Sequence, residues 1–203
     1  DDFTYFVVGS DQVWNPVCIT PNDDWYYLKF VNPNQRVALA PSIGIEALSA
    51  LQARRLAWGV KGFSRLSIRE QRGAELIQQY SGRTAAVICD PTLVIPRDAW
   101  IDVADDRLVP DSQYVFTYLL GGLTGSARTV LDSVTCNGEL SVLSLSDREG
   151  VGELPAGPAE FISFIMHAKH VVTDSFHAAV FASIMGTPLT IVRRSGSEKM
   201  FSR

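Results

Sequence analysis

The sequence has few cysteines and no motif that would use them. Cys18, Cys89 and Cys136 are widely spaced, odd in number and without a Cys-x-x-Cys pair. This pattern indicates neither a disulfide framework nor a thiolate metal site. We therefore expect a protein of a reducing compartment.

Long apolar runs and an excess of positive charge are also missing. No segment approaches the roughly 20 apolar residues that a membrane-spanning helix needs, and no signal peptide is recognisable. The formal net charge is -4, which argues against nucleic acid as a partner but leaves room for a local site for a small anion. We predict a soluble chain with no transmembrane segment and no nucleic-acid partner.

Several cofactor signatures are absent as well. The sequence contains no HExxH, Walker A or GxGxxG pattern, so zinc protease, NTPase and dinucleotide-binding functions lack their characteristic parts. The neighbouring Asp23 and Asp24 are interpreted as a solvated loop, and we predict no metal site. What the chain does have is 46% apolar residues, enough for one large core or two small ones.

Apolar segments of strand type alternate with segments of helical spacing along the chain. The strand candidates are continuous runs of apolar residues, which is typical of parallel sheets covered on both faces, so we predict an α/β fold. The expected strands end near residues 9, 40, 68, 95, 120, 145 and 174, and the expected helices lie near 46–63, 71–82, 124–136, 158–168 and 176–185.

The alternation breaks in a span rich in proline and aspartate and then restarts. We predict an N-terminal Rossmann-like domain over residues 1–95, a linker over 96–112 and a C-terminal Rossmann-like domain over 113–203. Each domain is expected to be a doubly wound parallel sheet, with a cleft between the two.

Polar residues follow several of the predicted strands. In open parallel sheets, ligands bind beyond the carboxyl ends of the strands, where helix N-termini present unpaired N–H groups. The candidate corners are Gly9-Ser10-Asp11, Ser42-Ile43-Gly44, Arg69-Glu70 and Asp174-Ser175-Phe176-His177.

His177 is the residue of most interest. Asp174 or Ser175 is expected to cap a helix that Gly186 ends, which places His177 in the first turn. A helix N-terminus disfavours the imidazolium, whereas a bound phosphate or carboxylate would favour it. The alternative is a structural histidine at a strand-to-helix junction, the interpretation adopted for His167 and His170.

Other polar and aromatic residues also have two interpretations. Arg69 could pair with Glu70, with a carboxylate of a helix or with a ligand. Asp11 could cap a helix or act at a site. The aromatic set would suit stacking on a sugar ring or a core cluster; it comprises Trp14, Trp25, Tyr26, Tyr27 and Phe30.

Four blocks in order along the chain resemble the motifs of the polysaccharide pyruvyl transferase family. They are GSDQVWN at 9–15, SIRE at 67–70, DPT at 90–92 and DSFH at 174–177. The flanking segments and the terminal Ser202-Arg203 extend the resemblance over nearly the whole chain.

The resemblance implies a two-domain fold of the GT-B kind, incomplete at both ends. It implies transfer of the enolpyruvyl group of phosphoenolpyruvate, without a cofactor, onto a hexose of a cell-surface polysaccharide or its lipid-linked precursor. A cytoplasmic location, including the inner face of the membrane, would follow. The alternatives are a glycosyltransferase that uses a nucleotide sugar and a non-catalytic carbohydrate-binding relative.

The resemblance also implies roles for individual residues. His177 would be the catalytic acid and Asp11 the base. The substrate-binding residues would be Ser10, Arg69, Glu70, Ser175, Phe176 and Arg203. Where many relatives have SFHG, this chain has alanine at positions 178 and 179, a difference that bears on the acceptor rather than the donor.

Overall fold

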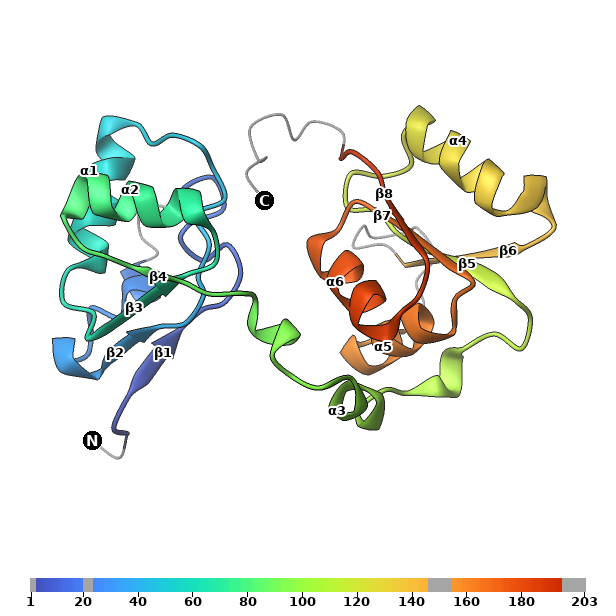
Figure 1. The fold of residues 1–203 in the computed structure, drawn as a ribbon, viewed down its shortest axis with the longest axis horizontal. Helices are drawn as coiled ribbons and strands as arrows, with labels where there is room; N and C mark the ends of the chain where they lie inside the picture. Colours follow the sequence, from blue (N-terminus) through green and yellow to red (C-terminus); the bar gives the residue numbers. More distant parts are fainter. Residues whose placement is uncertain (1–2, 20–23, 146–154, 195–203) are drawn as a thin grey trace. The chain divides into compact units, whose positions relative to one another are not determined.

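The computed structural model describes residues 3–19, 24–145 and 155–194. The chain divides into two compact units, with the first extending to Val94 and the second beginning at Ile95. Each unit contains one four-stranded sheet in which all neighbouring strands are parallel (Figure 1). The α/β class with two parallel sheets is therefore confirmed.

The first unit has the strand order β1-β2-β3-β4, which is the order of the chain. Its strands and α-helices are β1 (Phe6–Val8), β2 (Arg36–Ala38), α1 (Ala50–Val60), β3 (Arg65–Ile68), α2 (Gln71–Ser81) and β4 (Ala86–Val87). Every crossover moves across the sheet in one direction, and right-handed crossovers then place their helices on one face. Accordingly, α1 and α2 lie together on the same side of this sheet (Figure 1).

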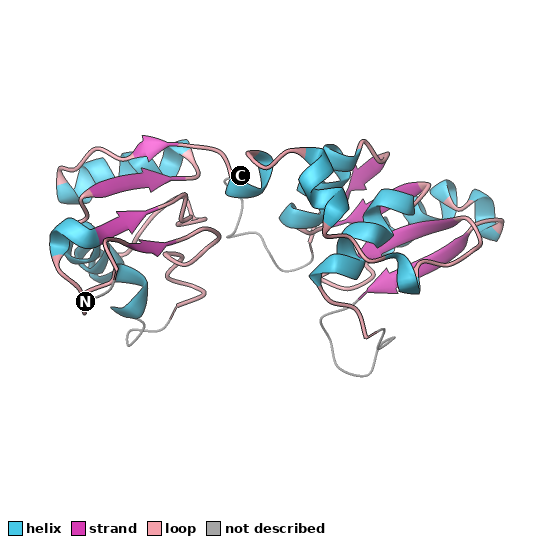
Figure 2. Cartoon of the chain, turned by 90° about the horizontal axis from the view of Figure 1, so that it is seen from below, coloured by secondary structure: helices cyan, strands magenta, loops and turns pink. Residues whose placement is uncertain are grey.

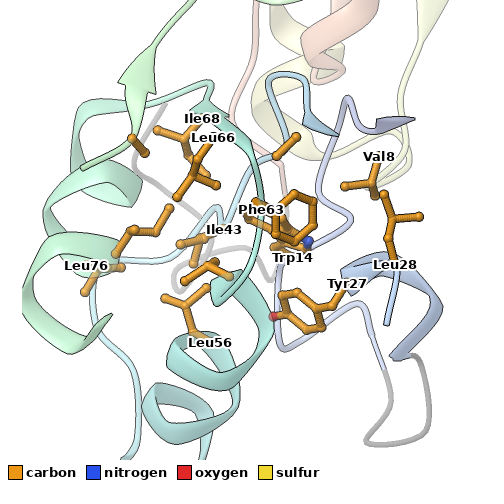
Figure 3. Packing of buried hydrophobic residues seen from close by; sticks show 14 of the residues in the cluster. Val8, Trp14, Tyr27, Leu28, Ile43, Leu56, Phe63, Leu66, Ile68 and Leu76 are labelled. Carbon is orange, nitrogen blue, oxygen red and sulfur yellow. The ribbon is translucent and has the colours of Figure 1, made fainter. Parts of the chain in front are cut away.

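One face of this sheet carries the core of the first unit. Val8, Ala38 and Ile68 are buried on it, and Trp14 stacks on Tyr27 with ring centroids 5.6 Å apart (Figure 3). The indole Nε1 of Trp14 donates a hydrogen bond to the Tyr26 carbonyl, so the buried ring keeps its polar group satisfied.

The opposite face differs from the sequence-based expectation of a sheet buried on both sides. Tyr5, Val7 and Leu39 alternate with the core residues and are 43–56% exposed. The run ending at Ile95 was expected to be a fully apolar strand interrupted at Asp90 and Pro91, but β4 has only two residues, both exposed. Whether a sheet is buried on one face or on both therefore depends on the order of its strands, because that order decides which faces the helices cover. The apolar runs of the sequence do not reveal strand order.

The ends of the helices follow their capping residues. The α1 helix begins after Ser49, whose side chain accepts from the Gln52 amide in a capping box, rather than at residue 46 as the spacing suggested. The α2 helix ends at Gly82, which adopts φ 70°.

The second unit has the strand order β6-β5-β7-β8. Its strands and α-helices are α3 (Arg97–Asp102), β5 (Tyr114–Tyr118), α4 (Gly125–Val134), β6 (Ser141–Leu145), α5 (Pro158–His167), β7 (His170–Thr173), α6 (Phe176–Met185) and β8 (Leu189–Ile191). Strand β6 lies on one side of β5, and β7 and β8 lie on the other. Right-handed crossovers therefore place α4 on one face of the sheet and α5 and α6 on the other. Figure 2 shows the helices and strands of each unit from a second direction.

Strand β5 is buried on both faces, as its apolar sequence predicts. Tyr114 and Phe116 belong to the core cluster with α5 and α6, while Val115 and Thr117 face the other way and are also buried. The reversal of strand order between β5 and β7 makes their carboxyl ends a topological switch point, the usual place for a ligand in such sheets.

The span 96–112, expected as a linker, has structure of its own. It contains α3 and a 3-10 turn over Asp106–Leu108, and it lies in the second unit. Trp100 packs edge-on against Phe181 at 5.0 Å between ring centroids, and Ile101 and Leu108 join the same core.

Candidate functional site

Loops from several strands meet at the carboxyl edge of the first sheet. The Ser42 amide donates to the Asp11 carbonyl at 2.7 Å, which joins the loop after β1 to the loop after β2. The Arg69 amide donates to the Pro41 carbonyl at 3.0 Å, which adds the end of β3. Three corners that the sequence indicated separately are thus brought together.

Arg69 lies at this edge between two carboxylates. Its Nη1 is 2.5 Å from Oδ2 of Asp90, and its Nη2 is 3.2 Å from Oδ1 of Asp11. The guanidinium side chain is 8% exposed. The sequence suggested Glu70 as an ion-pair partner, and the structure supplies Asp90 and Asp11 instead.

Asp90 was not among the predicted site residues. It ends the loop after β4, its side chain is fully buried, and its Oδ1 accepts hydrogen bonds from the Thr92 amide and hydroxyl at 3.0 and 2.7 Å. Burial acts to raise the pKa of Asp90, but the hydrogen bonds from Thr92 and Arg69 outweigh it and leave the pKa below 3.8. The sequence feature that could have identified Asp90 is the Asp-Pro-Thr motif at a strand end. This motif turns the chain and places the Asp90 carboxylate against Arg69.

Glu70 braces the neighbouring loop. Its Oε1 accepts hydrogen bonds from the Ile43 amide at 2.8 Å and from the Gly44 amide at 3.2 Å. Those two amides are therefore engaged by a carboxylate of the protein itself. Glu70, which follows the carboxyl end of β3, thereby holds the Ser42-Ile43-Gly44 loop in place.

The Gly9-Ser10-Asp11 corner has an unusual backbone. The Gly9–Ser10 peptide is cis, and Asp11 has φ 57°, in the left-handed region that few residues other than glycine and asparagine adopt readily. Residues 11–14 form turns rather than a helix, so Asp11 caps no helix. Its side chain is 58% exposed and points its carboxylate to Arg69.

The second corner lies at the switch point of the second unit. Ser175 is the N-cap of α6 and accepts from the Ala178 amide, as predicted, and Gly186 ends the helix with φ 75°. His177 is the second residue of α6 and is half-buried, with its ring edge-on to Phe176 at 5.3 Å. The predicted position of the imidazole in the first turn is confirmed.

Asp174 holds this corner together. Its carboxylate, 2% exposed, accepts from the Leu120 and Gly121 amides at 2.7 Å each, and so ties the loop after β5 to the start of α6. Arg194 donates to the Asp174 carbonyl at 3.2 Å and lies 3.5 Å from its carboxylate. Sequence reasoning treated Asp174 only as a possible cap.

The remaining candidates have structural partners or fall outside the described ranges. Arg203 and Asp23 lie outside the described residues. His167 pairs with Asp106 at 3.2 Å, and His170 lies 2.9 Å from the Thr190 hydroxyl. Within the described ranges, no group of three His, Cys, Asp or Glu side chains is placed to hold a metal ion.

The aromatic set divides between core and surface. Trp14 and Tyr27 are buried, whereas Trp25, Tyr26 and Phe30 are exposed. A cavity of about 610 Å³ lies against α1, and it is lined mainly by apolar side chains that include Trp14, Tyr27 and the half-exposed Trp58. Ile43 lines it too, which places the cavity beside the braced loop of the Arg69 corner.

Comparison with known protein families identifies a match over nearly the whole chain. A family model described as polysaccharide pyruvyl transferase matches residues 2–196. Searches of curated proteins and of solved structures return no match. Among the described helices, none has both the length and the apolar character needed to cross a membrane.

Proposed function

The chain belongs to the polysaccharide pyruvyl transferase family, and we propose that it transfers the enolpyruvyl group of phosphoenolpyruvate onto a hexose of a cell-surface polysaccharide or of its lipid-linked precursor. The product is a pyruvate ketal, and no cofactor takes part. The family match over nearly the whole chain supports the reaction class. The first turn of α6, with His177 at a topological switch point, is the observation that carries the choice of an anionic donor.

Phosphoenolpyruvate carries a phosphate and a carboxylate on one small skeleton. The N–H groups at the start of α6 favour an anion through the helix dipole, and an imidazolium at His177 donates a charged hydrogen bond. Arg69 is assigned to the donor as a second cationic group. Ser175 and Phe176 shape the first turn. In the first unit, Ser10 precedes the proposed base Asp11, and Glu70 holds the Ser42-Ile43-Gly44 loop.

The chemical step needs one acid and one base. His177 protonates the methylene carbon of the donor, and the resulting oxocarbenium-like carbon is attacked by one sugar hydroxyl, whose proton Asp11 accepts. A second hydroxyl of the same sugar then attacks this carbon and gives its proton to the now neutral His177, while the bond to the phosphate oxygen breaks and inorganic phosphate leaves as the ketal closes. One phosphate is released for each ketal formed.

The acceptor is assigned to the cavity against α1. The half-exposed ring of Trp58 suits the apolar face of a sugar, and a cavity of about 610 Å³ is within the usual range for small-molecule sites. Ile43 lines the cavity and follows Ser42, whose amide donates to the Asp11 carbonyl, so the cavity wall is connected to the loop of the proposed base.

The direct test is phosphate release from phosphoenolpyruvate in the presence of acceptor, with the ketal identified by NMR. His177→Ala should lower turnover at least about a hundredfold, since a general acid contributes about 10²- to 10⁴-fold. His167→Ala is the matched control, because His167 ends α5 and pairs with Asp106. Near-normal ketal formation by His177→Ala would remove His177 from catalysis.

A thermal-shift titration tests the donor itself. Stabilisation by phosphoenolpyruvate is expected, and stabilisation by UDP-sugars alone would favour glycosyl transfer instead. Retained saccharide binding without phosphate release would favour a non-catalytic relative.

A further inference from the structure

The two carboxylates that hold Arg69 differ sharply in burial. Asp90 is fully buried and lies 2.5 Å from Nη1, whereas Asp11 is 58% exposed and lies 3.2 Å from Nη2. Both contacts are ion pairs, but only one of them is open to solvent. The guanidinium therefore has one internal partner and one partner at the surface.

Asp90 is a permanent partner of Arg69. Thr92 occupies its other oxygen with two hydrogen bonds, and removing one member of a buried pair leaves an uncompensated charge. Asp11 is held much more weakly, because water screens an exposed ion pair and its formation restricts a mobile side chain. Of the two, Asp11 is the partner that another anion can replace.

The charges of the cluster give a reason for replacement. Arg69 contributes one positive charge and the two carboxylates contribute two negative charges, so the three side chains together carry a net charge of -1. A phosphate or carboxylate that approaches Nη2 is repelled while Asp11 occupies that position. Once Asp11 has moved away, Nη2 can donate to the incoming anion, and Asp90 remains on Nη1.

We propose that Asp11 is a displaceable gate on Arg69: an anionic group of the donor takes its place on Nη2, and the released carboxylate becomes available to the acceptor hydroxyl. This inference rests on the proposed function, in which Arg69 binds the donor and Asp11 is the base. It adds an order of events, with the donor binding first and thereby freeing the base. An Asp11 paired with Arg69 is held away from the acceptor until the donor is present.

The test is calorimetric titration of the full chain with inorganic phosphate and with phosphoenolpyruvate. Asp11→Asn should bind both anions about two- to fivefold more tightly than the wild type, the size expected from loss of an exposed ion pair. Turnover by the same variant should fall about a hundredfold or more. Tighter donor binding with slower chemistry is a combination that a purely structural Asp11 would not produce.

Two further variants complete the design. Glu75→Gln is the matched control, because Glu75 is 49% exposed and forms a similar ion pair with Arg72 in the same unit, and its anion affinity should equal that of the wild type. Arg69→Lys loses the planar fork and should bind both anions at least about tenfold more weakly. Asparagine and glycine both tolerate φ 57°, so Asp11→Gly serves as a second test if Asp11→Asn does not fold.

The outcomes separate the inference from the proposed function. If Asp11→Asn binds the anions no more tightly than the wild type while Arg69→Lys binds them weakly, the gate is wrong and the donor site stands. If Arg69→Lys binds as well as the wild type, Arg69 does not hold the donor, and both the gate and this part of the proposed function fail. Tighter phosphate binding by Asp11→Asn, together with no ketal product from the wild type, would keep the gate and reject the reaction.

Discussion

At the scale of single residues, Asp90 is predicted to contribute far more to stability than Asp11, although both pair with Arg69. Asp90→Asn leaves a nearly buried guanidinium without its main counter-charge, so we expect the first unit to lose about 3–5 kcal/mol of unfolding free energy. Asp11→Asn breaks an exposed pair and should cost less than about 1 kcal/mol. Urea unfolding followed by tryptophan fluorescence measures both, and equal losses would contradict the assignment.

Unfolding of the wild type and of Asp90→Asn at low pH tests whether the charged form of Asp90 stabilises the folded state. The folded-state pKa of Asp90 lies below its ordinary value of 3.8, so its stabilisation is fully present above about pH 4 and is lost as the pH falls through the folded pKa. Asp90→Asn should therefore lose less stability than the wild type on acidification. Parallel losses would show that Asp90 is not the titrating group.

Residue roles that depend on sequence neighbours could be predicted, whereas contacts between distant residues could not. Ser175 and His177 were predictable because a helix start depends on neighbours within a few positions. The partners of Arg69 were not predictable, because Asp90 and Asp11 are distant in sequence and meet only through strand order. Asp174 was assigned a local capping role, whereas its carboxylate binds amides of a neighbouring strand's loop.

At the scale of elements, Gly59 in α1 is predicted to resist replacement by alanine. A Cβ at Gly59 would lie 2.3 Å from Cε1 of Tyr27, whose ring is buried and stacked on Trp14. Helix propensity favours alanine by about 1 kcal/mol, but overpacking costs typically about 1–3 kcal/mol, and this ring has little room to move. We expect Gly59→Ala to lower the thermal unfolding temperature.

Gly125 is the matched control for Gly59. It begins α4, and a Cβ built there meets no atom within 4 Å. Gly125→Ala should therefore stabilise the protein slightly through propensity alone. A stabilised Gly59→Ala variant would mean that Tyr27 can shift, and the packing argument for α1 would be wrong.

The type of each helix and strand was predicted more accurately than its first and last residues. Helices and strands appear where the spacing placed them, but α1 starts later because Ser49 supplies the cap, and β4 is shorter because the chain turns at Asp90 and Pro91. Helix α3 was missed because six residues within a polar span give too little periodicity to detect. Its Trp100 is explained only by its contact with Phe181.

At the scale of the whole molecule, strand order explains what the apolar runs left open. The sequence predicted α/β architecture in two parts, but it predicted burial on both faces for both sheets. In the second sheet the order of the parallel strands reverses at β5, and helices lie on both faces. In the first sheet the described strands follow chain order, and α1 and α2 lie on one face. Strand order depends on long-range pairing, which no local pattern encodes.

The division of the chain into units leads to a prediction about autonomous folding. The core of the second unit is built from its own residues, from Trp100 in α3 to Leu189 in β8, so the fragment Ile95–Ser197 should fold alone. Trp100 is its only tryptophan and packs against Phe181, so urea should produce a cooperative red shift of its emission.

A shorter fragment decides where this unit begins. A chain starting at Gln113, the residue with which the predicted C-terminal domain opens, lacks Trp100, Ile101 and Leu108, all of which pack on the core. Since loss of a large buried side chain alone costs about 3–5 kcal/mol, circular dichroism should show this fragment unfolded or much less stable. If both fragments unfold at the same urea concentration, residues 95–112 behave as a linker, and α3 does not belong to the folded unit.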